Sequence, residues 1–248
     1  MSQIVLITGG AKGVGRGISE AFLAAGATVV TCGREAPETL PGKADFIATN
    51  VRDAEARAAL LSEVMARHGR LDVLVNNAGG APFALAEKAS PKFHESIMAL
   101  NLLAPLHLAQ AANAVMQRQE QGGVIVFIAS ISAMRPSPGT AAYGAAKAGI
   151  LSLTQSLAVE WAPKVRVVAV SPGLVQTEQT GLHYGDEAGV AAVAATIPAG
   201  RLAQPQEIGA ACVWLASPVA AYASGTNIVL NGGGERPAFL TAANARHA

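Results

Sequence analysis

Short apolar runs alternate along the chain with longer segments in which apolar residues recur at helical spacing. The short runs are rich in β-branched side chains, as expected for strands buried on both faces of a sheet. We expect strands at residues 4–7, 28–32, 44–49, 71–75, 124–128, 165–170 and 227–230. The first helical segment ends near residue 25, and the others span 54–68, 91–116, about 140–161 and 205–215. This alternation predicts an α/β fold, a doubly wound parallel sheet with helices on both faces.

Two stretches depart from the regular alternation. Pro105 lies inside the long helical segment 91–116, and a helical proline frees the carbonyl four residues earlier, here that of Asn101. A water bound at that carbonyl is expected to link it to Lys147. Residues 178–200 are rich in Gly and Ala and only weakly patterned, which suits a mobile substrate lid better than core.

Composition and charge exclude several classes of function. The chain has 248 residues, which suits one domain over residues 1–248, and its net charge of +1 points to neither nucleic acid nor an anionic membrane. No apolar stretch near the start is long enough for a signal or spanning segment. Cys32 and Cys212 are isolated among apolar residues and are expected to be reduced thiols in a cytoplasmic protein. The five His residues show no metal-binding spacing, so we expect no metal site.

A glycine-rich turn follows the first predicted strand. It reads TGGAKGVG at residues 8–15 and leads directly into a helical segment. Glycines allow the backbone to approach a pyrophosphate, and the helix N-terminus supplies N–H donors to it. A glycine-rich turn alone can be no more than a tight turn, but its place between a strand and a helix favours a dinucleotide site.

The end of the second predicted strand bears on cofactor choice. A fold that prefers NAD places an acidic residue there, on the ribose 2′-hydroxyl, whereas this chain has Gly33 and Arg34. A guanidinium can grip a 2′-phosphate in a bidentate manner, and Lys12 in the glycine-rich turn offers a second cation. Either charge alone is as readily an ordinary surface residue. Together with the missing acid they favour NADP(H), with NAD(H) as the second option.

Candidate chemistry gathers after the fifth predicted strand. Ser130 lies at the carboxyl end of that strand, where open α/β sheets place their ligands, and Tyr143 and Lys147 share one helix face. An ammonium about 4 Å from the phenol is worth up to about 4 kcal/mol and can bring the phenol pKa from about 10 to about 7. Such a tyrosine can exchange a proton with a carbonyl or alcohol oxygen that Ser130 holds. Taken alone, the pair also fits a tyrosine packed in a helix interface with the lysine in solvent.

Six motifs, taken together with their order and spacing, favour the catalytic interpretation of Tyr143 and Lys147 over the packing interpretation. They are TGGAKGVG at 8–15, NNAG at 76–79, Asn101, Ser130, YGAAK at 143–147 and PGLVQT at 172–177. With them the chain resembles the short-chain dehydrogenase/reductase family, in its compact single-domain branch, over essentially its whole length. The resemblance implies a Rossmann-like fold and an NAD(P)-dependent oxidoreductase.

The resemblance also implies roles for individual residues. Tyr143 is the acid/base, Ser130 orients the substrate oxygen, and Lys147 lowers the phenol pKa and binds the nicotinamide ribose. Asn101 carries a proton-relay water. The candidate cofactor-binding residues follow from the same motifs: Gly9, Ala11, Lys12, Gly13, Val14, Gly15, Arg34, Asn50, Val51, Asn77, Ala78, Gly79, Tyr143, Lys147, Pro172, Gly173, Val175 and Thr177. The family has Asp near the adenine where this chain has Asn50, and we expect a modest effect on affinity.

Three functions remain open at this point. The main interpretation is an NADP(H)-dependent enzyme that interconverts a carbonyl compound and a secondary alcohol. The alternatives are a 3-oxoacyl-thioester reductase and, from another class, a catalytically silent nucleotide-binding regulator. A homo-oligomer, dimer or tetramer, is expected because the family pairs the helix 141–161 between subunits and because Ile150, Leu153 and Leu157 on it are too many for one contact.

Overall fold

Seven parallel strands form the centre of the molecule, whose computed structural model describes residues 2–242. The sheet order is β3-β2-β1-β4-β5-β6-β7. The strands are β1 (Ile4–Thr8), β2 (Thr28–Gly33), β3 (Asp45–Ala48), β4 (Val73–Asn76), β5 (Gly123–Ile128), β6 (Val165–Pro172) and β7 (Asn227–Leu230). The helices are α1 (Gly13–Ala24), α2 (Ala54–His68), α3 (Pro91–Met98), α4 (Ala104–Met116), α5 (Ala141–Trp161), α6 (Thr180–Tyr184), α7 (Glu187–Ala195), α8 (Pro205–Ala216) and α9 (Ala238–Ala242). The predicted doubly wound α/β sheet is confirmed.

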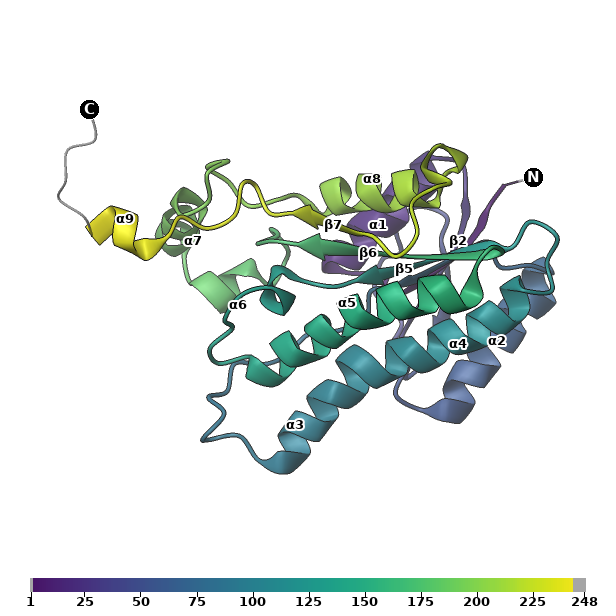
Figure 1. Ribbon diagram of the computed structural model, residues 1–248, viewed down its shortest axis with the longest axis horizontal. Coiled ribbons are helices and arrows are strands. Elements are labelled where there is room, and N and C mark those ends of the chain that lie inside the picture. Colours follow the sequence, from purple (N-terminus) through teal and green to yellow (C-terminus); the bar gives the residue numbers. More distant parts are fainter. Residues whose placement is uncertain (1, 243–248) are drawn as a thin grey trace.

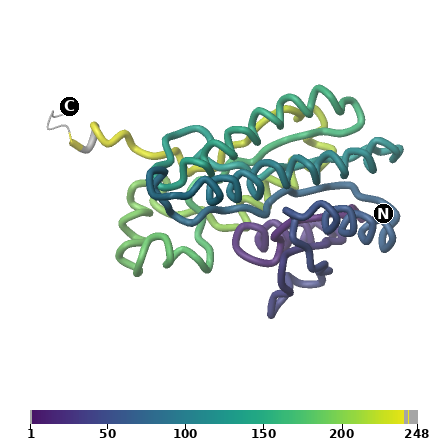
Figure 2. Tube along the Cα trace, turned by 90° about the horizontal axis from the view of Figure 1, so that it is seen from below, coloured from purple at the N-terminus to yellow at the C-terminus, as the bar shows by residue number. Residues whose placement is uncertain are grey.

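Helices cover both faces of the sheet. Figure 1 shows α1 and α8 on one face and α2, α4 and α5 on the other. Seen from below, α5 lies beside a continuous rod made of α3 and α4 (Figure 2). On the first face the two helices approach closely at a glycine pair: a Cβ at Gly17 would lie 2.3 Å from the backbone of Pro205, and a Cβ at Gly209 would lie 2.5 Å from the carbonyl of Gly17.

The apolar strand runs divide between two cores. Alternate residues of β1 point to opposite faces, with Leu6 in the core under α2, α4 and α5, and Val5 and Ile7 in the core under α1 and α8. All five residues of β1 are buried. Burial on both faces explains why these strands read as continuous apolar runs rather than as alternating patterns.

The long helix predicted for residues 91–116 is interrupted. It consists of α3, a π-helical turn over Ala99–Leu103, and α4, and Asn101 lies in the π turn. Pro105 has no N–H to donate, and the Ala104 N–H bonds instead to the Ala99 carbonyl five residues earlier. The prediction of one long helix is therefore corrected to two helices joined by a π turn at Asn101. The freed Asn101 carbonyl stays a prediction.

Residues 178–200 contain helices that the sequence pattern did not indicate. Asp186 caps α7 by accepting a hydrogen bond from the Gly189 N–H, and α6 precedes it as a single short helix. α7 buries none of its residues. A helix without a buried face has no apolar periodicity for a sequence to reveal.

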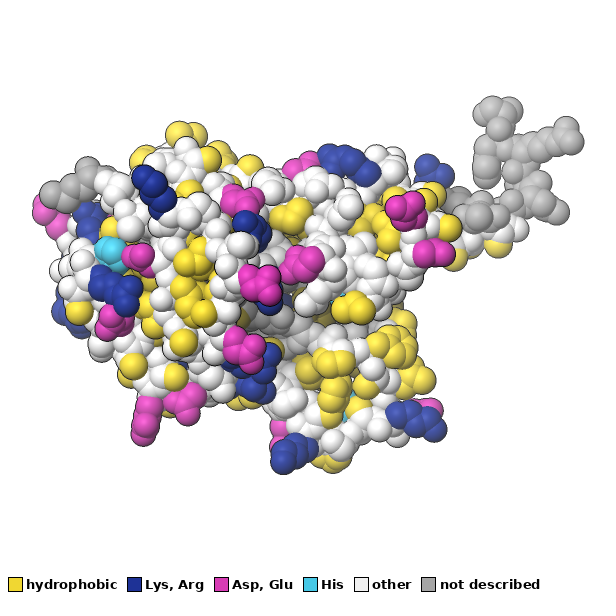
Figure 3. Space-filling view, turned by 180° about the vertical axis from the view of Figure 1, so that it is seen from behind, with side chains coloured by type: hydrophobic (Ala, Val, Ile, Leu, Met, Phe, Trp, Pro, Cys, Tyr) yellow, Lys and Arg dark blue, Asp and Glu magenta, His cyan; other side chains and the backbone are white. Residues whose placement is uncertain are grey.

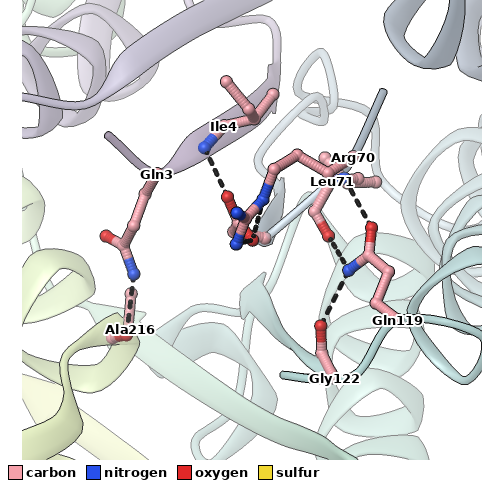
Figure 4. Close-up of polar contacts among 8 residues, drawn as sticks. Gln3, Ile4, Arg70, Leu71, Gln119, Gly122 and Ala216 are labelled. Atoms are coloured by element: carbon pink, nitrogen blue, oxygen red, sulfur yellow. Dashed lines mark hydrogen bonds and ion pairs between the residues drawn. The ribbon is translucent and has the colours of Figure 1, made fainter. Parts of the chain in front are cut away.

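Polar side chains connect the segments at the amino-terminal ends of the strands (Figure 4). Gln119 receives the Leu71 N–H at 2.8 Å and donates to the carbonyls of Leu71 and Gly122 at 2.9 and 2.8 Å. The buried carboxylate of Asp72 accepts the Ile4 N–H at 2.7 Å. The backbone of Asp72 also bonds to both neighbouring strands, through its N–H to the Ile4 carbonyl and its carbonyl to the Val124 N–H, each at 2.9 Å. β4 begins at Val73, two residues later than predicted.

No helix within residues 2–242 is long and apolar enough to cross a membrane. The same residues contain no group of three or more His, Cys, Asp or Glu side chains placed to hold a metal ion. The two cysteines, Cys32 and Cys212, are free and buried.

Candidate active site

The loops after the strands enclose a cleft of about 700 Å³. The space-filling view is hollowed near its centre, where side chains of both charges border the depression (Figure 3). Most of the predicted site residues line this cleft: Gly9, Lys12, Gly13, Val14, Gly15, Arg34, Asn50, Val51, Asn77, Ala78, Gly79, Ser130, Tyr143, Lys147, Pro172, Gly173, Val175 and Thr177. Ala11 and Asn101 are buried and do not line it.

The glycine-rich turn is built for close approach of the backbone. A Cβ on Gly15 would lie 2.1 Å from the Gly9 carbonyl and 2.5 Å from Asn77 Nδ2, so no larger residue fits. Asn77 Nδ2 donates to the Thr8 carbonyl at 2.9 Å, and Thr8 Oγ1 accepts the N–H groups of Asn77 and Ala78 at 3.0 and 2.9 Å. The end of β4 thereby braces the turn that follows β1.

The N-terminus of α1 opens onto the cleft. Lys12 is the N-cap residue, and its side chain makes no capping hydrogen bond. The first helical N–H, that of Gly13, donates to Glu178 Oε2 at 3.2 Å. Free N–H groups and the helix dipole make this a suitable place for a pyrophosphate.

Two cations stand exposed in the cleft, beside the turns that follow β1 and β2. The side chains of Lys12 and Arg34 form no hydrogen bond or ion pair with another residue in the part of the chain that the structure describes. Asn50 Oδ1 accepts the backbone N–H of Arg52 at 3.2 Å. Arg52 also lines the cleft and adds a third positive charge there. The residues present therefore fit a dinucleotide that carries an additional phosphate.

Ser130, Tyr143 and Lys147 converge as the sequence predicts. Ser130 follows β5 and accepts the Ser132 N–H at 3.1 Å, and it shares a hydrogen bond with Tyr143 in the first turn of α5. Lys147, one turn further along, donates to the Ile128 carbonyl at 2.7 Å and lies 5.6 Å from the centre of the Tyr143 ring. A hydroxyl, a phenol and an amine thus face one crevice.

The pKa values of this pair differ from the sequence expectation. Burial lowers the pKa of Lys147 from 10.5 to about 8. Burial raises the pKa of Tyr143, and the hydrogen bond to Ser130 acts in the opposite direction. The predicted net fall of the phenol pKa is therefore not found in this structure, because loss of hydration is the largest effect on the tyrosine. The contribution of Lys147 to that pKa stays a prediction.

Asn101 takes a bracing position beside the cleft. Its Oδ1 accepts the Gly80 N–H at 2.8 Å, and its Nδ2 donates to the carbonyls of Gly80 and Ile97 at 3.0 and 2.9 Å. A Cβ on Gly79 would lie 2.7 Å from Asn101 Oδ1 and 3.4 Å from Lys147 Nζ, so Asn101 and Lys147 both flank this glycine. The relay water between them stays a prediction.

Several residues that line the cleft were missed by the sequence analysis. Arg52 follows the predicted Asn50 and Val51, and its charge was the available signal. Glu178, His183 and Tyr184 lie in the segment 178–200 predicted as a substrate lid, but its lack of an apolar pattern did not indicate which of its residues face the cleft. Burial raises the pKa of Tyr184, and the charge of Arg135 lowers it.

Comparisons with known proteins agree with this geometry. A protein-family model described as enoyl-(acyl carrier protein) reductase matches residues 9–235. The 3-oxoacyl-[acyl-carrier-protein] reductase FabG of Vibrio harveyi is 35% identical, over 93% of this chain and 96% of that protein. The D-threitol dehydrogenase of Mycolicibacterium smegmatis is 37% identical, over 93% of this chain and 92% of that protein. The ligand-free aldohexose dehydrogenase of Thermoplasma acidophilum superposes with a TM-score of 0.89 at 27% identity, covering 100% of this chain and 97% of that chain.

Proposed function

The chain belongs to the short-chain dehydrogenase/reductase family of oxidoreductases acting on CH–OH and C=O groups, and from this premise we propose that it uses NADP(H) to interconvert a ketone or other carbonyl compound and a secondary alcohol. One observation carries the proposal. Ser130, Tyr143 and Lys147 meet in the same cleft as the glycine-rich turn of α1. The reacting carbonyl and the cofactor therefore have adjacent places.

The cofactor, when bound, supplies a hydride to the carbonyl carbon or removes one from the alcohol carbon. The turn at Gly9, Gly13 and Gly15 would hold its pyrophosphate, with the N–H groups of α1 as donors. Lys12 and Arg34 would hold the 2′-phosphate that distinguishes NADP(H). Thr177 and the Pro172–Gly173 loop would hold its nicotinamide end, a role carried over from the family.

Tyr143 is proposed to transfer the proton. Its phenol reaches the substrate oxygen from the cleft wall, and Ser130 Oγ would orient the same oxygen by a second hydrogen bond. Since burial raises the pKa of Tyr143, the phenol is protonated at neutral pH and ready to donate to a carbonyl oxygen. The positive charge of Lys147 favours the phenolate that forms when this proton leaves.

A 3-oxoacyl-thioester reductase is the second candidate. It is favoured by the names of relatives such as the Vibrio harveyi FabG, which match nearly the whole chain. The D-threitol dehydrogenase name favours a small hydroxylated substrate instead. A catalytically silent regulator is disfavoured, because the three candidate catalytic side chains are intact and converge.

NADPH oxidation across a panel of ketones, quinones and 3-oxoacyl thioesters tests the proposal and separates the candidates. Tyr143→Phe should still bind NADPH and lose turnover by about 100-fold or more, the usual share of a general acid. Tyr222→Phe is the matched control, because Tyr222 is fully exposed. Near-normal turnover in Tyr143→Phe would remove Tyr143 as the acid/base.

We also propose a homo-oligomer, dimer or tetramer, in the cytoplasm. Ile150 and Leu157 on α5 are buried within the protomer and so cannot form the expected contact with another subunit. Support comes instead from large hydrophobic side chains that remain exposed: Val159 on α5 at 82%, Trp214 on α8 at 47% and Val219 beyond it at 84%. Light scattering at micromolar concentration tests it, and a monomer would refute it.

A further inference from the structure

The carboxylate of Glu178 lies against the N-terminus of α1. Glu178 Oε2 accepts the Gly13 N–H at 3.2 Å, and both residues line the large cleft. Thr177, the residue before Glu178, also lies against Gly13, since a Cβ on Gly13 would lie 3.5 Å from the Thr177 methyl group. A contact between residues 165 positions apart thus closes over the glycine-rich turn.

This contact occupies the first N–H of α1, at the helix terminus where the proposed function places the pyrophosphate. Lys12, the N-cap residue, adds no side-chain hydrogen bond at this terminus, so Glu178 supplies the anion that the helix N-terminus attracts. A carboxylate and a pyrophosphate cannot share one N–H donor, and two anions at this distance repel each other. Binding of one therefore requires departure of the other.

We propose that Glu178 is a built-in competitor of the cofactor, whose carboxylate occupies the pyrophosphate position at Gly13 and leaves when the dinucleotide binds. This inference rests on the proposed function, which places the cofactor in the cleft. Its consequence is a lower cofactor affinity than the cleft would otherwise have.

The same contact connects the cofactor position to α6. The Thr177 N–H donates to Thr180 Oγ1 at 2.7 Å, and the Gln179 N–H donates to Thr177 Oγ1 at 3.2 Å, so Glu178 sits within a tight hydrogen-bonded turn. Thr180 starts α6, which also places Tyr184 at the cleft. Displacement of Glu178 therefore frees one anchor of the segment that covers the substrate side.

Calorimetric titration of NADPH into wild type, Glu178→Gln and Glu178→Ala tests the competition. We expect Glu178→Ala to bind NADPH about three- to tenfold more tightly, where tenfold corresponds to about 1.4 kcal/mol, with Glu178→Gln between it and wild type. Glu178 is exposed, so neither change disturbs the core. Glu120→Gln is the matched control for lost negative charge, since Glu120 is exposed and lies outside the cleft; its Kd should equal that of wild type.

A ligand without a pyrophosphate separates direct competition from a general charge effect. Adenosine 2′-monophosphate carries the adenosine and the 2′-phosphate but has nothing to place at Gly13, so its Kd should be the same in wild type and Glu178→Ala. An equal gain for both ligands, or no gain for NADPH, would overturn the inference while leaving the proposed function standing. If no variant bound NADPH or NADH, the proposed function itself would fail.

Discussion

Replacement of Lys147 by Met should change how the stability of the protein depends on pH. The Lys147 side chain is only 4% exposed, and its Nζ donates to the Ile128 carbonyl at 2.7 Å. No carboxylate accompanies it in the hydrogen bonds of this site, so burial lowers its pKa from 10.5 to about 8. Lys147→Met keeps most of the side-chain length and removes the group that titrates.

The sign and size of the effect follow from proton linkage. Below pH 8 Lys147 is charged in both the folded and the unfolded protein, and the folded protein bears the cost of a buried charge. Between about pH 8 and 10.5 only the unfolded protein keeps this proton, so the free energy of unfolding of wild type rises with pH relative to the variant. The fall in pKa corresponds to about 3 kcal/mol at about 1.4 kcal/mol per unit.

Urea denaturation at pH 7, 8, 9 and 10, at fixed protein concentration, measures this difference. Loss of the donor to the Ile128 carbonyl should cost the variant about 1–3 kcal/mol at every pH, which sets the baseline. Burial raises the pKa of Cys32 and Cys212 to about 12 in both proteins, so their contribution cancels. If the difference between wild type and Lys147→Met were constant from pH 7 to 10, the lowered pKa of Lys147 would be refuted.

Three further variants test the cofactor site and the fold separately. Wild type should prefer NADPH over NADH by about tenfold or more, and Gly33→Asp/Arg34→Ala should lose that preference in calorimetric titrations; an unchanged preference would place the selectivity elsewhere. Gly15→Ala should abolish measurable NADPH binding, since its Cβ would lie 2.1 Å from the Gly9 carbonyl, and normal binding would contradict the role of the turn. Gln119→Ala should lower the free energy of unfolding by about 2–3 kcal/mol through three lost hydrogen bonds, while the NADPH Kd stays the same. A change in Kd would show that the amino-terminal ends of the strands are coupled to the cleft at their carboxyl ends.

The sheet could be predicted from the sequence because burial on both faces leaves a strong signal. The central strands, such as β1, are compact apolar runs, whereas the edge strands β3 and β7 are only partly buried. The glycine-rich turn after β1 fixes where the first helix begins. The placement of Ser130, Tyr143 and Lys147 followed from two local facts, the end of a strand and one turn of a helix. Local geometry of this kind is readable without knowledge of the tertiary structure.

Contacts between distant segments could not be predicted in the same way. Glu178 reaches the N-terminus of α1 from the segment that follows β6, although β4 and β5 lie between β6 and β1 in the sheet, and no periodicity in residues 178–200 marks that approach. Asn101 was singled out for a freed carbonyl, but its side chain is the part that bonds to Gly80 and Ile97. Such pairings depend on how loops fold back, which a one-dimensional pattern does not contain.

The pKa shifts of Tyr143 and Lys147 determine the protonation state of the pair at neutral pH. Burial opposes charge on both groups, and it acts oppositely on their pKa values because the lysine is charged when protonated and the tyrosine when deprotonated. As pH rises, Lys147 therefore loses its proton well before Tyr143 does. At neutral pH the pair is an ammonium beside an intact phenol, the state that donates a proton to a carbonyl oxygen. Removal of a proton from an alcohol needs the phenolate, which burial disfavours, so at neutral pH we expect the pair to be in the protonation state from which carbonyl reduction starts.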